Sequence, residues 1–236
     1  MALISETIPM NNTCQVAYCN RPTRKYGRYC DTHQKAEQRW GHPLQRPVSK
    51  GEMTKAKHRV NTMIAAHPNS AALKASLLEA LHAIRADGAD VEAQIKDGRM
   101  AMKKSIVQHH HQVRRILDEV DHWEIVLTVI AVGWISAEER PRFPTDNGLW
   151  ASIARRLHVQ TQSAFKRHAS KTGVRRRVAS DLRPVVQIMV GKTFSQVFVP
   201  FGWKLYDMGI KAEERGTEAR KAPLIALDST PESTSA

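Results

Sequence analysis

The chain has 236 residues and a formal net charge of +13 at pH 7, and 42% of its residues are hydrophobic. This length allows one large domain or two small ones, and the hydrophobic content is enough for a buried core. Helix-forming residues dominate and only 6% of the residues are aromatic, so the composition favours a mainly α-helical fold.

All three cysteines lie near the N-terminus, after a predicted flexible arm at residues 1–12. Cys14, Cys19 and Cys30 are followed by His33, with spacers of four, ten and two residues. Three cysteines and one histidine are a standard ligand set for a closed structural zinc site, and no cysteine is left over. Residues three apart in the first turn of a helix can point the same way, which suits Cys30 and His33. The sequence therefore predicts a structural zinc ion in a module spanning 13–48; unrelated thiols are the alternative.

The residues around these ligands resemble the small zinc knuckle of many bacteriophage proteins. The usual pattern is C-x4-C-x-R-P, a basic loop, G-x-C-x-x-H, a basic helix and G-x-P, and residues 14–22, 27–33 and 41–43 carry the resemblance. Gln34 departs from it, because an aromatic residue commonly follows the histidine. Such knuckles often accompany phage HNH homing-type endonucleases and other phage DNA-binding proteins. The resemblance implies a zinc-held module that contacts nucleic acid.

The positive charge is concentrated in two segments. Residues 1–60 carry a net +7 and residues 151–192 a net +9, whereas 61–150 and 193–236 carry −2 and −1. Two basic modules on a near-neutral scaffold favour a polyanionic partner, and we expect double-stranded DNA. In the first segment the predicted contacts are Arg21, Arg24, Lys25, Arg28, Lys35 and Arg39.

Residues 49–140 are predicted to form a helical core. Leu73, Leu77 and Leu81 recur at helical spacing, and a longer helical pattern starts near Asp90. The apolar run at 123–137 is too short for a comfortable membrane span, so we expect a buried helix that could also mediate self-association. No membrane partner is expected.

The second basic segment lies in a predicted basic helical region at 148–212, in which residues 150–168 resemble a helix-turn-helix unit. The turn would centre on 158–159, although glycine is usual where His158 stands, and 160–168 would be the recognition helix. An ordinary basic amphipathic helix is the alternative. The predicted contacts are Arg155, Arg156, Gln160, Gln162, Ser163, Lys166, Arg167, Lys171, Arg175, Arg176 and Arg177. Beyond them, 185–199 favours a helix over a strand, and 213–236 is predicted to be disordered.

Catalytic signatures are weak. The residues nearest to an HNH active site, Asp118, Asp121, His122, Asp146 and Asn147, lie outside any ββα strand pattern. The consecutive histidines at 109–111 point about 100° apart on a helix and do not suit one metal ion.

The sequence thus favours a zinc-containing, phage-type nucleic-acid-binding protein without enzymatic activity. An HNH-type endonuclease or its remnant is one alternative, and a phage structural or assembly protein contacting packaged nucleic acid is another. The start of the chain lacks a signal peptide, so we expect a cytoplasmic location, in the host if the protein is phage-encoded.

Overall fold

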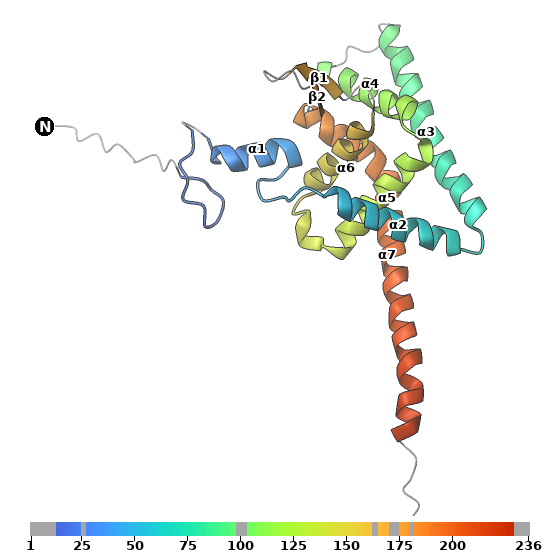
Figure 1. Cartoon of the computed structure of the whole chain (residues 1–236). Helices are drawn as coiled ribbons and strands as arrows, with labels where there is room; N and C mark the ends of the chain where they lie inside the picture. The colour runs from blue at the N-terminus through green and yellow to red at the C-terminus, as the bar shows by residue number, and fades with distance from the viewer. Residues whose placement is uncertain are drawn as a thin grey trace, which may run out of the picture.

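The computed structural model describes residues 13–24, 27–97, 103–161, 165–169, 175–179 and 182–228, and these form a mainly helical protein, as predicted. Its elements are α1 (Asp31–Trp40), α2 (Lys50–Ala66), α3 (Ser70–Lys96), α4 (Lys104–Glu119), α5 (His122–Glu138), the 3-10 helix η1 (Arg140–Arg142), α6 (Asp146–Gln160), β1 (Phe165–Ala169), β2 (Arg175–Ala179) and α7 (Pro184–Asp228). Figure 1 shows α2 to α6 and the first part of α7 gathered into one body. The loop before α1 projects from this body on one side, and the C-terminal part of α7 projects on another (Figure 1).

The centre of the body is α5, which is the predicted apolar core helix. Every residue from 125 to 135 is buried, and α2, α3, α6 and α7 all contact this helix. Asp121 caps its start, because its carboxylate accepts a 2.9 Å hydrogen bond from the Glu124 backbone N–H. Within the described residues no single helix has the length and apolarity of a membrane span, although α4 and α5 meet that test together across a 117° bend.

Glycines let α7 lie directly on the backbones of its neighbours. A Cβ atom at Gly202 would lie 2.5 Å from the Ile130 carbonyl oxygen of α5. At Gly191 it would lie 1.9 Å from the Trp150 carbonyl oxygen of α6. Both distances are too short for any side chain, so these contacts require residues without a Cβ.

A buried arginine holds the segment that links the N-terminal module to the body. The side chain of Arg142 is 4% exposed and donates 2.9 Å hydrogen bonds to both carboxylate oxygens of Glu52 and to the Pro47 carbonyl. Glu52 also completes a capping box with Ser49 at the start of α2. The bonds from Arg142, followed by those from Ser49, lower the pKa of Glu52 to about 2.

The predicted helix-turn-helix is wrong. α6 continues through the predicted turn at 158–159 to Gln160, and residues 165–168 of the predicted recognition helix belong to strand β1. β1 pairs with β2 as an antiparallel hairpin, in which Phe165 lies opposite Ala179. The turn is absent because His158 is buried in the inner face of α6, 2.9 Å from the side-chain amide of Gln112 on α4.

The C-terminal region also differs from expectation in part. Residues 185–199 are helical, as predicted, and the strand alternative is wrong. α7 continues to Asp228, so 213–228 are helical where the sequence predicts disorder. Lys, Arg, Glu and Ala dominate this stretch, and they are strong helix formers even when polar composition indicates an unfolded tail. The predicted arm at 1–12 and the last residues, 229–236, lie outside the described residues.

The close approach of α7 to α6 predicts opposite effects for two glycine substitutions. Gly191→Ala should destabilise the protein by about 1–3 kcal/mol, because the new Cβ overlaps a backbone carbonyl that cannot rotate away. Gly88→Ala, within α3, meets no atom within 4 Å and should stabilise the fold by up to about 1 kcal/mol through helix propensity. Urea unfolding of both variants measures the difference, and equal effects would contradict the close contact.

The ion pair of Glu52 predicts an acid-sensitive component of stability. Its folded-state pKa lies below its ordinary value of 4.5, so the unfolded state takes up the proton first as the pH falls. The stabilisation is therefore present above pH 4.5 and is lost as the pH falls toward about 2. Glu52→Gln should be less stable than the wild type at pH 7, and the difference should shrink over this window in denaturant titrations. Glu138→Gln, which breaks an exposed pair with Arg59, should have a much smaller effect at any pH.

Candidate metal centre

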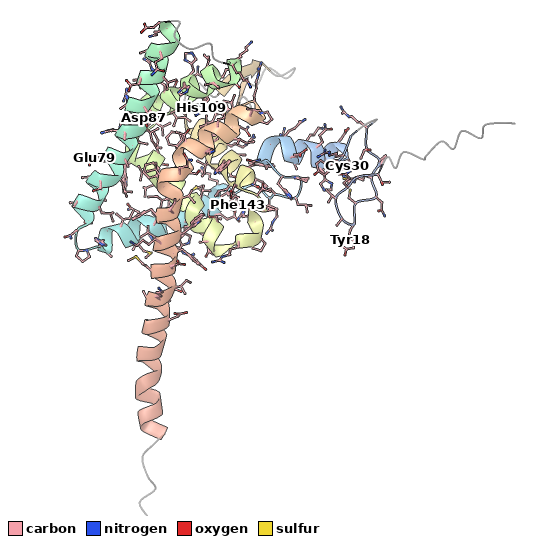
Figure 2. The ribbon with its side chains drawn as sticks, turned by 180° about the vertical axis from the view of Figure 1, so that it is seen from behind. Tyr18, Cys30, Glu79, Asp87, His109 and Phe143 are labelled. Atoms are coloured by element: carbon pink, nitrogen blue, oxygen red, sulfur yellow. The ribbon has the colours of Figure 1, made fainter. Side chains whose placement is uncertain are left out.

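The four predicted ligands come from one loop and the helix that follows it. Cys14 and Cys19 lie on the loop, which is closed by a hydrogen bond of 3.0 Å from the Cys14 N–H to the Arg21 carbonyl. Cys30 is the N-cap residue of α1, and His33 lies in the first turn of this helix. The start of α1, where Figure 2 shows Cys30, therefore places two ligands beside the two that the loop supplies.

The ligand atoms meet at distances that suit a tetrahedral ion. One donor atom from each of the four residues lies within 4.8 Å of all the others. The Nδ1 atom of His33 is 3.3 Å from the Cys14 Sγ and 3.5 Å from the Cys30 Sγ, and the Sγ atoms of Cys19 and Cys30 are 4.0 Å apart. Around a tetrahedral zinc ion, sulfur atoms lie about 3.8 Å from each other and about 3.5 Å from a ligand nitrogen. All three cysteines are free, so these residues could hold a metal ion.

The cluster has a small core of its own and an uneven electrostatic environment. Cys14, Cys30 and Val16 are buried, and Tyr29 packs against them. Burial raises the pKa of Cys14, but hydrogen bonds from the backbone of Cys30 and Val16 and from His33 outweigh this and lower it to about 6. A hydrogen bond with the backbone of Arg21 acts to lower the pKa of Cys19. Burial and the neighbouring thiols of Cys14 and Cys30 outweigh it, so the pKa of Cys19 is raised overall.

No family model, curated protein or solved structure matches this chain. The knuckle resemblance thus stays a prediction from residues 14–43.

The basic residues of the N-terminal module divide into two groups. Arg21 donates to the Thr32 hydroxyl at 3.0 Å, and Arg24 forms a 2.7 Å ion pair with Asp31, so both brace the loop against α1. The predicted contacts Arg28, Lys35 and Arg39 are exposed, and Lys25 lies outside the described residues.

The module is joined to α6 by contacts that the sequence does not reveal. The guanidinium carbon of Arg155, a predicted DNA contact, lies 4.7 Å from the ring centre of Trp40 at the end of α1. The buried side-chain amide of Gln45 donates at 2.8 Å to both the Gly148 carbonyl and the Ser152 hydroxyl. Gln45 carries no recognisable motif, and its partners lie more than a hundred residues away in the sequence.

The nucleic-acid contacts predicted in the second basic segment lie on two different elements, α6 and the β1–β2 hairpin. Arg156 is half-buried, and burial followed by the neighbouring Arg155 lowers its pKa. Gln160 is also half-buried and donates to the Thr128 hydroxyl at 3.0 Å, so its amide is used within the fold. The hairpin carries Lys166, Arg167, Arg175, Arg176 and Arg177, whereas Gln162, Ser163 and Lys171 lie outside the described residues.

Three of the five residues considered for an HNH site have structural roles. Asp118 pairs with Arg85 at 2.8 Å and with Arg114 at 3.5 Å. Asp121 caps α5, and the Nε2 atom of His122 lies 3.1 Å from the Leu117 carbonyl oxygen. Among the residues that the structure describes, the only group arranged to hold a metal is the N-terminal cluster.

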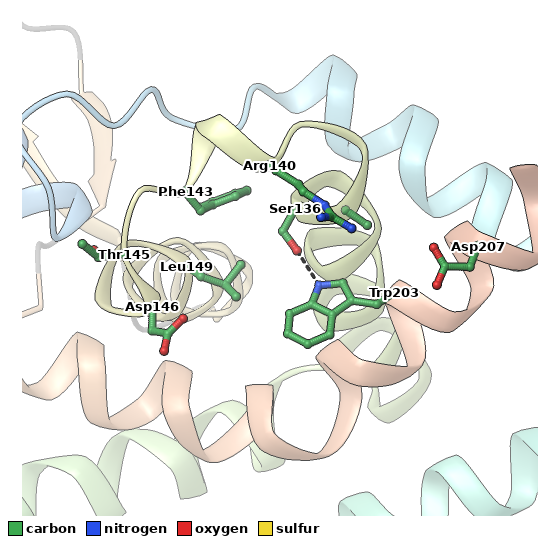
Figure 3. A pocket seen from close by; sticks show the side chains of 9 residues that line it. Ser136, Arg140, Phe143, Thr145, Asp146, Leu149, Trp203 and Asp207 are labelled. Carbon is green, nitrogen blue, oxygen red and sulfur yellow. Dashed lines mark hydrogen bonds between the residues drawn. The ribbon is translucent and has the colours of Figure 1, made fainter.

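A pocket of about 400 Å³ lies between α5, α6 and α7, away from the cluster (Figure 3). Trp203 forms one wall, and its Nε1–H donates to the Ser136 hydroxyl at 2.8 Å. Arg140 lines the pocket together with Asp146 and Asp207. The wall therefore carries both positive and negative side chains, and it favours neither an anionic nor a cationic ligand.

The cluster predicts one bound metal ion per chain, and its thiolate-rich ligand set favours zinc. Wild-type protein should therefore contain stoichiometric zinc by elemental analysis, and Cys30→Ser should lose most of it. Gln34→Ala, on the same helix but without a ligand atom in the cluster, is the matched control and should keep its zinc. Chelation should leave the helical circular dichroism largely intact, since the helical body contributes no ligand. Full zinc in Cys30→Ser would contradict the site.

Proposed function

We propose that this chain is a zinc-containing, non-enzymatic protein that binds nucleic acid, with DNA as the expected ligand. The observation that carries the proposal is the Cys3His cluster, which supports a compact module outside the helical body (Figure 1). Exposed basic side chains on this module, among them Arg28 and Lys35, are available for phosphate oxygens. A bacteriophage origin would agree with the knuckle resemblance.

The distribution of charge supports a polyanionic ligand. Within the body, basic side chains are paired with acidic ones from other helices, as in Arg59 with Glu138 and Arg85 with Asp118. The excess positive charge remains on 1–60 and 151–192. The second of these segments contains the β1–β2 hairpin, and a two-stranded ribbon is one of the shapes that fit the DNA major groove.

The non-enzymatic part of the proposal is supported by the roles of the candidate catalytic residues. Asp118, Asp121 and His122 are used in an ion pair, a helix cap and a backbone contact, respectively. A metal-dependent endonuclease would need such groups to converge on a second metal. An assay for Mg²⁺-dependent cleavage of plasmid DNA tests this point directly, and we expect the substrate to stay intact.

Binding should depend steeply on salt if phosphate contacts dominate it. On duplex DNA the logarithm of the affinity should fall with the logarithm of the salt concentration, with a slope of about −0.9 per phosphate contact. Arg28→Ala and Lys35→Ala should each remove about one phosphate contact and so make the slope shallower by about 0.9, because both side chains are exposed on the module. Arg85→Ala, whose side chain pairs with Asp118 on the body, is the control and should leave the slope unchanged. An affinity that does not vary with salt would overturn the proposal.

A further inference from the structure

Tyr18 is the most exposed large side chain of the module. Its relative exposure is 104%, so its ring makes essentially no contact with the rest of the protein. It lies between the first two ligands, Cys14 and Cys19, on the loop before α1, which projects from the body (Figure 1). Figure 2 shows it pointing away from both Cys30 and the helices.

The backbone at Tyr18 is unfavourable for a tyrosine. Its φ is +64°, and it is the one residue other than glycine with a positive φ in the described part of the chain. The Cys19 N–H donates to the Val16 carbonyl at 3.0 Å, which makes Tyr18 the third residue of a tight turn. A positive φ at this turn position favours glycine or asparagine, because the Cβ of other residues crowds the backbone.

The module does not need this ring for its own packing. Val16 and Tyr29 fill the small core around the cysteines, and the ring of Tyr18 lies outside it. Tyrosine therefore adds backbone strain without contributing buried surface. Strain that the fold does not use is characteristic of residues that act on a ligand.

The surroundings of the ring indicate what that ligand is. The loop around it is held by backbone hydrogen bonds to two basic residues, from the Cys14 N–H to the Arg21 carbonyl and from the Gln15 N–H to the Arg28 carbonyl, both at 3.0 Å. The exposed neighbours in the loop are small or polar, so the ring is not part of a broad apolar patch of the kind that protein partners usually cover. A lone flat aromatic ring on a module with exposed basic side chains such as Arg28 suits an unpaired nucleobase, which offers a π-face and an adjacent phosphate.

We propose that Tyr18 stacks on an unpaired base, so that the module favours single-stranded DNA, or duplex DNA with unpaired bases, over fully paired duplex. This inference rests on the proposed function and adds the class of nucleic acid. In a paired duplex the bases stack on one another, and the ring can reach only the backbone.

The test compares three ligands and two variants. The ligands are a paired DNA duplex, the same duplex with a short unpaired bulge, and a single-stranded thymidine oligonucleotide. Tyr18→Gly should weaken binding to the bulged and single-stranded ligands about 5- to 150-fold, while its affinity for the paired duplex stays unchanged. Tyr18→Phe keeps the ring and should retain the affinity for all three. Both variants should keep their zinc, and glycine should relieve the strained turn.

The outcomes separate the two proposals. Equal binding of the bulged ligand by wild type and Tyr18→Gly would overturn the stacking role and leave nucleic-acid binding intact. Absence of binding to every ligand by the wild type would overturn both. If Tyr18→Gly weakened binding to all three ligands equally, Tyr18 would contact the nucleic-acid backbone and not a base, which would contradict stacking. Loss of zinc by Tyr18→Gly would show that the fold needs the ring, which also contradicts the inference.

Discussion

A helix that is apolar on every face is stable in water only if other elements cover every face, and α5 imposes this requirement on the chain. Cover on one side comes from α7, which reaches the α5 backbone at Gly202 and inserts the fully buried Phe194 and Phe198 into the core. On another side α2 turns its buried residues, Val60 and Ile64 among them, toward α5. Four helices, α2, α3, α6 and α7, thus serve one packing problem, which is to cover α5.

The N-terminal module is built on a different principle. Its own core consists of Cys14, Val16 and Cys30 with Tyr29 beside them, which is too little apolar burial to hold a loop in place. Four ligand atoms gathered within 4.8 Å supply what is missing once a metal bridges them, since metal binding of this kind adds directly to folding stability. The contacts of Trp40 with Arg155 and of Gln45 with α6 then fix the module to the body.

The features that sequence reasoning identified are those encoded locally. Cys30 and His33 lie three residues apart, so their convergence follows from helix geometry. The unbroken apolar run of α5 predicts that this helix is buried. The helix-turn-helix failed because a turn at His158 and an unbroken helix share the same amphipathic pattern. The buried partner that decides between them, Gln112, lies 46 residues away. The contacts of Arg155 with Trp40 and of Gln160 with Thr128 could not be predicted for the same reason, since these residues are close only in the folded chain.

The position of α6 gives the two basic segments a common frame. Its N-terminal end contacts the knuckle through Gly148 and Ser152, and β1 of the basic hairpin begins five residues after α6 ends. Because α6 is packed against α5 and α7, the point at which it holds the module through Gln45 is fixed by the buried core. A nucleic acid that contacted the module would therefore meet a surface whose position on the body the core sets.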